Sequence, residues 1–140
     1  FVIASGSTYE AVITPTKSSG SVGGVVGYSL HDGGHTDAYS LIVGCFSESV
    51  CNNAILGGGQ NTSIYGTWGV GTNSFKHVGD NRLGVILYTD ATQCTQSQID
   101  EMNAAIDAFN ALQRTTLIDN VLVQCDKKWS YVSGSYPVLQ

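Results

Sequence analysis

Four cysteines constrain the fold of this 140-residue chain more than any other feature of its sequence. They are Cys45, Cys51, Cys94 and Cys125. An even number of cysteines in a short chain predicts two disulfide bonds, which form in oxidising compartments. No two of them have the C-x-x-C spacing of a zinc site or a redox motif. We therefore expect a secreted protein, a single domain over residues 1–140, with a core reinforced by disulfides.

The first residue and the charge balance agree with a secreted protein. The chain starts at Phe1, from which we expect that a leader was removed. Charged residues are 12% of the chain, about half the usual share of roughly 25%. The net charge of −5 argues against nucleic acids and anionic membranes as partners, because both require clustered Lys and Arg. No apolar run approaches the ~20 residues that span a bilayer. Asn61 begins an Asn-Thr-Ser triplet, a formal glycosylation sequon.

The residues from 96 to 113 show the clearest periodicity in the chain. Apolar side chains recur there at helical spacing, at Ile99, Met102, Ile106, Phe109 and Leu112. Thr95 with Gln98, or Ser97 with Asp100, can form a capping box at the start. The pattern predicts one long amphipathic helix.

Alternating or continuous apolar runs predict the strands. They lie at residues 9–14, 25–31, 36–46, 64–70, 83–89 and 121–124, the last extended through 129–132. The glycines at 33 and 34 favour a tight hairpin turn that sets Val26 opposite Leu41 and Val25 opposite Ile42. We find no internal repeat. The predicted fold class is α+β, an antiparallel sheet of five to six strands with the helix packed on one face and two disulfides.

Two disulfides among four cysteines allow three connectivities. Cys94 precedes the predicted helix and Cys125 ends the strand that follows it, so a bond between them would close a loop of about thirty residues. By the chain-entropy argument that loop contributes roughly 3–4 kcal/mol. Cys45 would then pair with Cys51. We favour this local connectivity, although the spacing does not exclude the other two.

Candidate catalytic residues gather at the tip of the predicted hairpin. His31, Asp32, His35 and Asp37 lie within seven residues, and imidazole and carboxylate groups suit acid–base chemistry or a divalent metal. Strand alternation places the two histidines on opposite faces, which favours a polar turn instead. No serine lies in a G-x-S-x-G elbow, and no residue pattern calls for a cofactor or a metal.

Aromatic residues form a second candidate site. Trp68, Tyr65, Trp129, Tyr131 and Tyr136 could make a platform for contact with a sugar or a protein. Aromatic side chains that alternate on strands are, however, more often part of a core.

The second half of the chain resembles a known family in the order of its elements. A strand around Tyr65-Gly66-Thr67-Trp68-Gly69-Val70 precedes an amphipathic helix with two Ile-Asp steps, and a closing strand ends in a cysteine. This order, over residues 63–126, is similar to that of the secreted necrosis-inducing effectors of plant-pathogenic fungi. In outline it also resembles fungal viral killer toxins. The resemblance implies a small disulfide-bonded α+β protein without catalytic residues.

Three functional hypotheses follow. The first is a secreted effector or toxin-like protein that binds a protein or cell-surface target of a host or competitor and performs no chemistry. The second is a small secreted hydrolase, ribonuclease-like or metal-dependent, that uses His31, His35 and the nearby acids. The third is a lectin-like module that uses the aromatic residues.

Overall fold

A computed structural model describes residues 23–26, 40–48, 50, 52–59, 62–74, 81–112 and 124–140. The elements are β1 (Ser40–Val43), β2 (Phe46–Ser47), β3 (Thr62–Val70), β4 (Arg82–Tyr88), a 3-10 turn at Ala91–Gln93, α1 (Gln96–Ala111), β5 (Trp129–Ser130) and β6 (Val138–Leu139). The expected strand at 9–14 and the expected hairpin turn at 33–34 lie outside the described residues.

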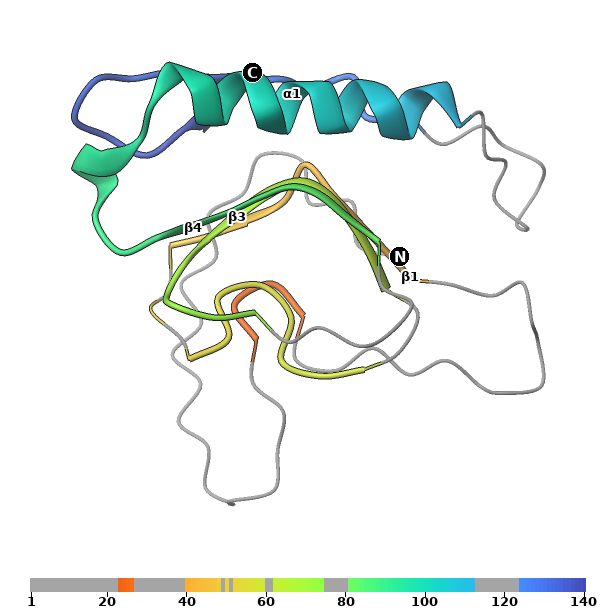
Figure 1. Cartoon of the computed structure of the whole chain (residues 1–140), viewed down its shortest axis with the longest axis horizontal. Coiled ribbons are helices and arrows are strands. Elements are labelled where there is room, and N and C mark those ends of the chain that lie inside the picture. The colour runs from red at the N-terminus through yellow and green to blue at the C-terminus, as the bar shows by residue number, and fades with distance from the viewer. Residues whose placement is uncertain are drawn as a thin grey trace.

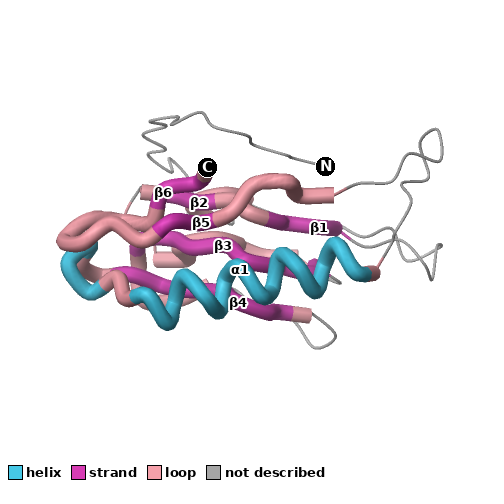
Figure 2. The backbone as a smooth tube through the Cα atoms, turned by 90° about the horizontal axis from the view of Figure 1, so that it is seen from above, coloured by secondary structure: helices cyan, strands magenta, loops and turns pink. Residues whose placement is uncertain are grey.

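The main sheet is parallel. β1 and β2 both pair with β3 along one side, and β4 pairs with β3 along the other (Figure 2). The register is the same on either side of the break between β1 and β2, because Val43 lies beside Tyr65 and Phe46 beside Trp68. β1 and β2 therefore act as one strand interrupted at Gly44 and Cys45.

Three glycines lie side by side across this sheet. The registers place Gly44 next to Gly66 and Gly66 next to Gly84, and their φ angles are 60°, 55° and 58°. This left-handed conformation is accessible to glycine and strained for other residues. Because all three strands turn at the same level, the whole sheet bends along one line, which Figure 1 shows as a ridge beneath α1.

Helix α1 packs directly on this glycine ridge. A Cβ atom on Gly66 would lie 2.5 Å from Ile106 Cγ1, and one on Gly84 would lie 2.8 Å from Ala105 Cβ. Side chains at these positions would push the helix away from the sheet. The glycines therefore supply both the bend and the close approach of α1.

The helix itself follows from local sequence. Thr95 accepts a hydrogen bond from the Gln98 backbone, and the Gln98 side chain accepts one from the Thr95 backbone, so the predicted capping box is confirmed. The buried residues of α1 are four of the five residues of the predicted stripe, Ile99, Met102, Ile106 and Phe109, joined by Ala105. The fifth, Leu112, lies at the C-cap and is exposed, so this part of the prediction is wrong. The expected packing on one face of the sheet is confirmed, and the helix ends two residues before the predicted boundary.

The sheet separates two apolar cores. The core beneath α1 contains Trp68, Val70, Ile86, Tyr88, Cys94, Ile99, Met102, Ile106 and Trp129. The core on the opposite face contains Ile42, Cys45, Ile55, Leu56 and Ile64. Both faces of β3 are therefore covered, as expected for the central strand of a parallel sheet.

The described segments outside the strands pack against one another beneath the sheet. Val26 bridges Leu56 in parallel, and Asn53 bridges Asn73 in parallel. The Asn73 side-chain amide also donates to Asn53 Oδ1 at 3.3 Å. Figure 1 shows the segments 23–26 and 52–59 on the face of the sheet away from α1. Successive turns of the chain thus stack on one another, as coils do in a solenoid.

The predicted antiparallel sheet is therefore wrong. Ile42 pairs with Ile64 and Val26 with Leu56, instead of with the partners expected from a hairpin. The strands predicted at 64–70 and 83–89 do form, as β3 and β4, but they run parallel to each other. Among the described residues, the short β5–β6 hairpin is the only antiparallel pair of strands.

The predicted Cys94–Cys125 disulfide is also wrong, and no disulfide is found in the described part of the chain. Both cysteines are free thiols. Cys94 precedes the helix, whereas the Cys125 backbone binds Asn110 near its other end. Fifteen helical residues span roughly 22 Å, far beyond the ~7 Å limit between bonded Cα atoms. Cys51 lies outside the described residues, so its pairing with Cys45 stays a prediction.

Candidate functional site

The C-terminal hairpin, residues 129–140, has an unusual composition. Its sequence WSYVSGSYPVLQ contains no charged side chain and is rich in Tyr and Ser. The Ser135 amide donates to the Val132 carbonyl at 3.2 Å, and Gly134 takes a φ of 70° in the turn. Tyr, Ser and Gly are also enriched in antibody binding loops, where Tyr supplies rigid contact area and the small residues supply adaptable hydrogen bonds.

Three large apolar side chains of this hairpin are exposed. Tyr131 is 41% exposed, Val132 39% and Val138 43%. Tyr131 and Val132 are adjacent in sequence, and Val138 pairs with Ser130 across the hairpin. The hairpin therefore exposes three apolar side chains on a segment without charged residues. We call Tyr131, Val132 and Val138 the hairpin patch.

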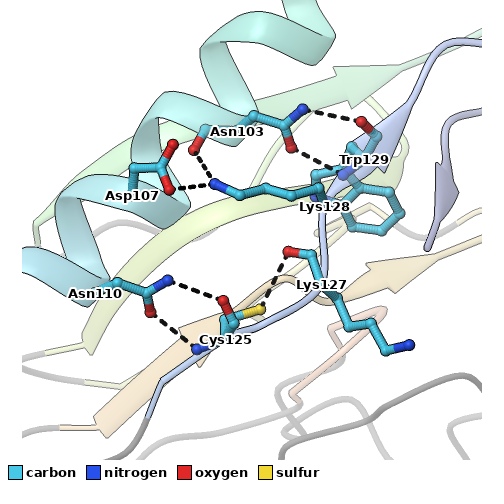
Figure 3. A network of polar contacts seen from close by, with 7 residues as sticks. All are labelled: Asn103, Asp107, Asn110, Cys125, Lys127, Lys128 and Trp129. Carbon is cyan, nitrogen blue, oxygen red and sulfur yellow. Dashed lines mark hydrogen bonds and ion pairs between the residues drawn. The ribbon is translucent and has the colours of Figure 1, made fainter.

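Asn103 of α1 holds the base of the hairpin through both ends of its side-chain amide. Its Nδ2 donates to the Trp129 carbonyl at 2.9 Å, and its Oδ1 accepts from the Trp129 amide at 2.8 Å (Figure 3). One side chain thus satisfies both polar groups of a backbone residue, as a neighbouring strand would.

Asn110 repeats the same arrangement two helical turns later. Its Nδ2 donates to the Cys125 carbonyl and its Oδ1 accepts from the Cys125 amide, both at 2.9 Å (Figure 3). Residues seven apart lie on one face of a helix and are separated by roughly 10 Å along it. That spacing approaches the reach of four extended residues, about 13 Å. The segment from Cys125 to Trp129 is therefore tied along α1 at two points.

An ion pair lies between these two ties. Lys128 Nζ pairs with Asp107 Oδ1 and also donates to the Asn103 carbonyl at 3.3 Å. The side chains are 39% and 69% exposed, so the pair contributes under about 1 kcal/mol. We call the contacts of Asn103, Asp107 and Asn110 of α1 with residues 125–129 the clasp.

The inner side of the hairpin packs on the aromatic core. Trp129 Nε1 donates to the Gly66 carbonyl at 2.6 Å, which joins the hairpin to the ridge of the sheet. Trp68 lies between two rings, with Phe46 stacked at 5.1 Å and Tyr136 stacked at 4.9 Å between ring centroids. Tyr88 meets Trp68 edge to face at 5.7 Å.

One polar atom of this cluster has no hydrogen-bond partner among the described residues. It is Nε1 of Trp68, whose side chain is fully buried. A buried donor without a partner costs about 1–3 kcal/mol. The contrast with Trp129 Nε1 is direct, because both indoles lie in the same core and only one is satisfied.

Tyr88 and Cys94 form a buried pair at the start of α1. The Tyr88 hydroxyl donates to Cys94 Sγ at 3.6 Å. Burial raises the pKa of Tyr88, and the hydrogen bond and the charge interaction with Cys94 raise it further. At neutral pH Tyr88 is therefore a neutral donor that packs in the core.

The structure places three residues of the predicted aromatic platform inside the molecule, and the platform stays a prediction. Trp68, Tyr65 and Trp129 are each at most 2% exposed, and their rings pack within the molecule. Of the five aromatic residues named from the sequence, Tyr131 alone is exposed, and Tyr136 is partly buried over Trp68. The strand pattern did not reveal this, because the residues that cover these rings come from α1 and the hairpin.

The predicted catalytic residues and the sequon cannot be placed. The described ranges do not include His31, Asp32, His35, Asp37 or Asn61. The hydrolase hypothesis for these residues therefore stays a prediction. In the part of the chain that the structure describes, no three His, Cys, Asp or Glu side chains are arranged to hold a metal ion.

Sequence reasoning missed the clasp and the glycine ridge. Asn103 and Asn110 lie on the polar side of α1, and their spacing of seven residues is the signal that could have marked one shared partner. The ridge follows a repeated pattern of an apolar residue before glycine, at Val43-Gly44, Tyr65-Gly66 and Leu83-Gly84.

A scan against protein-family models, a search of the curated proteins and a search of the solved structures each found no match to this chain. Among the residues that the structure describes, no helix is both long and apolar enough to cross a bilayer, in agreement with the sequence.

Proposed function

We propose that this chain is a secreted effector or toxin-like protein that acts by binding a protein target through the hairpin patch. The observation that carries the proposal is the exposure of Tyr131, Val132 and Val138 on a hairpin without charged side chains. Tyrosine is among the residue types that most often provide the central contacts of an interface, which makes Tyr131 the expected centre of the contact.

The clasp supports the proposal energetically. Asn103 and Asn110 fix the backbone at the base of the hairpin before any partner arrives. A surface that is already ordered loses less conformational entropy on binding, which strengthens the interaction. Because the patch carries no charge, its partner surface is apolar or neutral, and binding depends little on ionic strength.

The test uses purified, fluorescently labelled protein on plant protoplasts and on fungal cells. We expect saturable binding, with cell death or growth arrest, to one of the two cell types, and less than about a twofold change in affinity between 50 and 500 mM NaCl. The double variant Tyr131→Ala, Val138→Ser should lose this binding. The control Val50→Ser, at a side chain 83% exposed outside the hairpin, should keep it.

Two outcomes would contradict the proposal. If the protein binds neither cell type, it is not an effector or toxin for either of them. If the hairpin variant binds as well as the wild type, the contact with the target is not made by the hairpin patch. The double variant His31→Ala, His35→Ala distinguishes the hydrolase hypothesis from the binding hypothesis. If it folds but has lost its effect on the cells, the protein acts through chemistry and not through binding alone.

A further inference from the structure

Strand β4 has a neighbouring strand on one side only, within the part of the chain that the structure describes. Its register joins it to β3, and no described strand pairs with its other side. Figure 2 shows β4 at one margin of the fold, with β6 at the opposite margin. Beyond Arg82 the strand contains no charged residue and no proline, which are among the features that protect edge strands from pairing. We call this side of the strand the β4 edge.

The bend at Gly84 restricts which strand can pair with the β4 edge. The strands of the sheet bend at one level because Gly44, Gly66 and Gly84 share the left-handed conformation. A straight strand would diverge from β4 on one side of the bend, because paired backbones stay about 4.8 Å apart. A partner strand must therefore bend at the same level, and a second copy of β4 does so.

The side chains of β4 have a palindromic order around this bend. Leu83 lies beside Tyr65 on the side of α1, and a Cβ atom on Gly84 would point to the same side. Arg82 and Val85 lie on the side of the opposite core. The order of faces from 82 to 85 is therefore the same in both directions. Antiparallel pairing of β4 with its copy, about an axis between Leu83 and Gly84, keeps each cross-strand pair on one face.

The position of α1 fits the same two-fold arrangement. The helix lies over both Gly66 and Gly84, and so above the space between β3 and β4. Across a β4–β4 pair the two helix axes would be roughly 10 Å apart, which is the spacing of packed helices. The flank of α1 opposite the clasp carries Ala105, Ala108 and Leu112, and Leu112 is 44% exposed. Small and apolar side chains would therefore meet where the helices approach.

We propose that two copies of this chain form a two-fold symmetric dimer through the β4 edge, in which the two sheets join and the α1 helices lie antiparallel above the seam. Such dimers are the commonest assemblies of soluble proteins, because one self-complementary surface serves both partners. The hairpin patch lies at the other margin of the fold and stays uncovered (Figure 2). The dimer therefore does not depend on the proposed function.

The first test measures the mass of the protein in solution. Sedimentation equilibrium should give the mass of two chains, which falls towards that of one on dilution. Leu83→Lys places two ammonium groups side by side at the seam and should give a monomer, with circular dichroism as the check that it folds. The matched control is Val138→Lys, because Leu83 and Val138 are both 43% exposed. This control should still dimerise.

The second test locates the contact by hydrogen exchange at concentrations above and below the dissociation constant. Backbone amides within residues 83–88 should exchange faster in the monomer, because the strand pair that protects them is lost. Amides of residues 129–140 should exchange at the same rate in both states. If the amides of β4 do not respond to dilution, the dimer is not formed through the β4 edge.

Glu101 offers a variant that should strengthen the dimer. It lies on the same flank of α1, and its carbonyl oxygen would be 2.9 Å from a Cβ atom on Gly84, so the two copies of Glu101 approach each other near the axis. Like charges at this distance oppose association. Glu101→Gln should therefore lower the dissociation constant about two- to fivefold. Asp100→Asn, on the outer face of the helix, is the control and should leave it unchanged.

Four results would overturn the proposal. A monomer at every concentration excludes the dimer. A mass that grows beyond two chains indicates continuous assembly instead of a closed pair. Dissociation by Val138→Lys but not by Leu83→Lys assigns the contact to the hairpin patch. Equal dissociation constants for the wild type and Glu101→Gln would show that the helices do not meet above the seam.

Discussion

Asn103 bonds both polar groups of the Trp129 backbone, at 2.9 and 2.8 Å, and so takes the place of a neighbouring strand for that residue. The consequence extends to the ridge of the sheet, because the Trp129 indole in turn donates to the Gly66 carbonyl. Helix, hairpin and sheet are therefore joined through a single residue of the C-terminal segment.

Loss of the Asn103 amide should loosen the hairpin. We expect Asn103→Ala to destabilise the protein by about 1–3 kcal/mol, because it leaves two partly buried backbone groups without partners. Urea unfolding measures the loss, and exchange of the Trp129 amide locates it. Gln96→Ala is the control, since the Gln96 side chain donates to the exposed Asp100 side chain, and the variant should change stability by less than about 0.5 kcal/mol. Equal effects of the two variants would contradict the role of the clasp.

A side chain on the glycine ridge should be costly. Gly66→Ala places a Cβ atom 2.5 Å from Ile106 Cγ1 at a φ of 55°, and the strain and overpacking together should cost about 3 kcal/mol or more. Gly134→Ala has a similar φ of 70° but open space around it, so it should cost only about 1 kcal/mol. The difference between the two urea midpoints isolates the packing of α1 on the ridge. If both alanine variants unfold at the same midpoint, that packing is not close.

Tyr88 should make the protein unstable in alkali. Its pKa is raised in the folded state, so the unfolded chain ionises first, from its ordinary value of 10.0. Stability is then complete below that pH and falls as the pH rises above it, by about 1.4 kcal/mol per pH unit for this one group. Tyr88→Phe should remove this part of the slope, whereas Tyr131→Phe, at an exposed hydroxyl, should leave it unchanged. An identical slope in wild type and Tyr88→Phe would show that Tyr88 is not responsible.

The free thiols predict a labelling pattern. With no reductant present, iodoacetamide added to the unfolded chain should modify both Cys94 and Cys125, and mass mapping should find no peptide that joins them. In the folded protein Cys125, which is partly exposed, should react faster than the buried Cys94. Recovery of a Cys94–Cys125 peptide would restore the original prediction and would require α1 to lie differently.

The features that the sequence determined by itself are local ones. The start and the buried stripe of α1 follow from Thr95, Gln98 and the apolar spacing, because a helix is built from contacts three and four residues apart. The positions of β3 and β4 follow from their apolar runs in the same way. The neutral composition of the hairpin is also readable directly from residues 129–140.

Only the tertiary structure decided how these elements meet. The direction of β4 beside β3 depends on the path of the connecting chain, which no strand pattern encodes. The left-handed conformation of Gly66 bends the sheet because Gly44 and Gly84 adopt the same conformation beside it, and α1 packs directly above them. The burial of Trp68 depends on Tyr136, which lies 68 residues further along the chain. Each of these contacts joins residues far apart in sequence, and their stability comes from packing that exists only after the chain has folded.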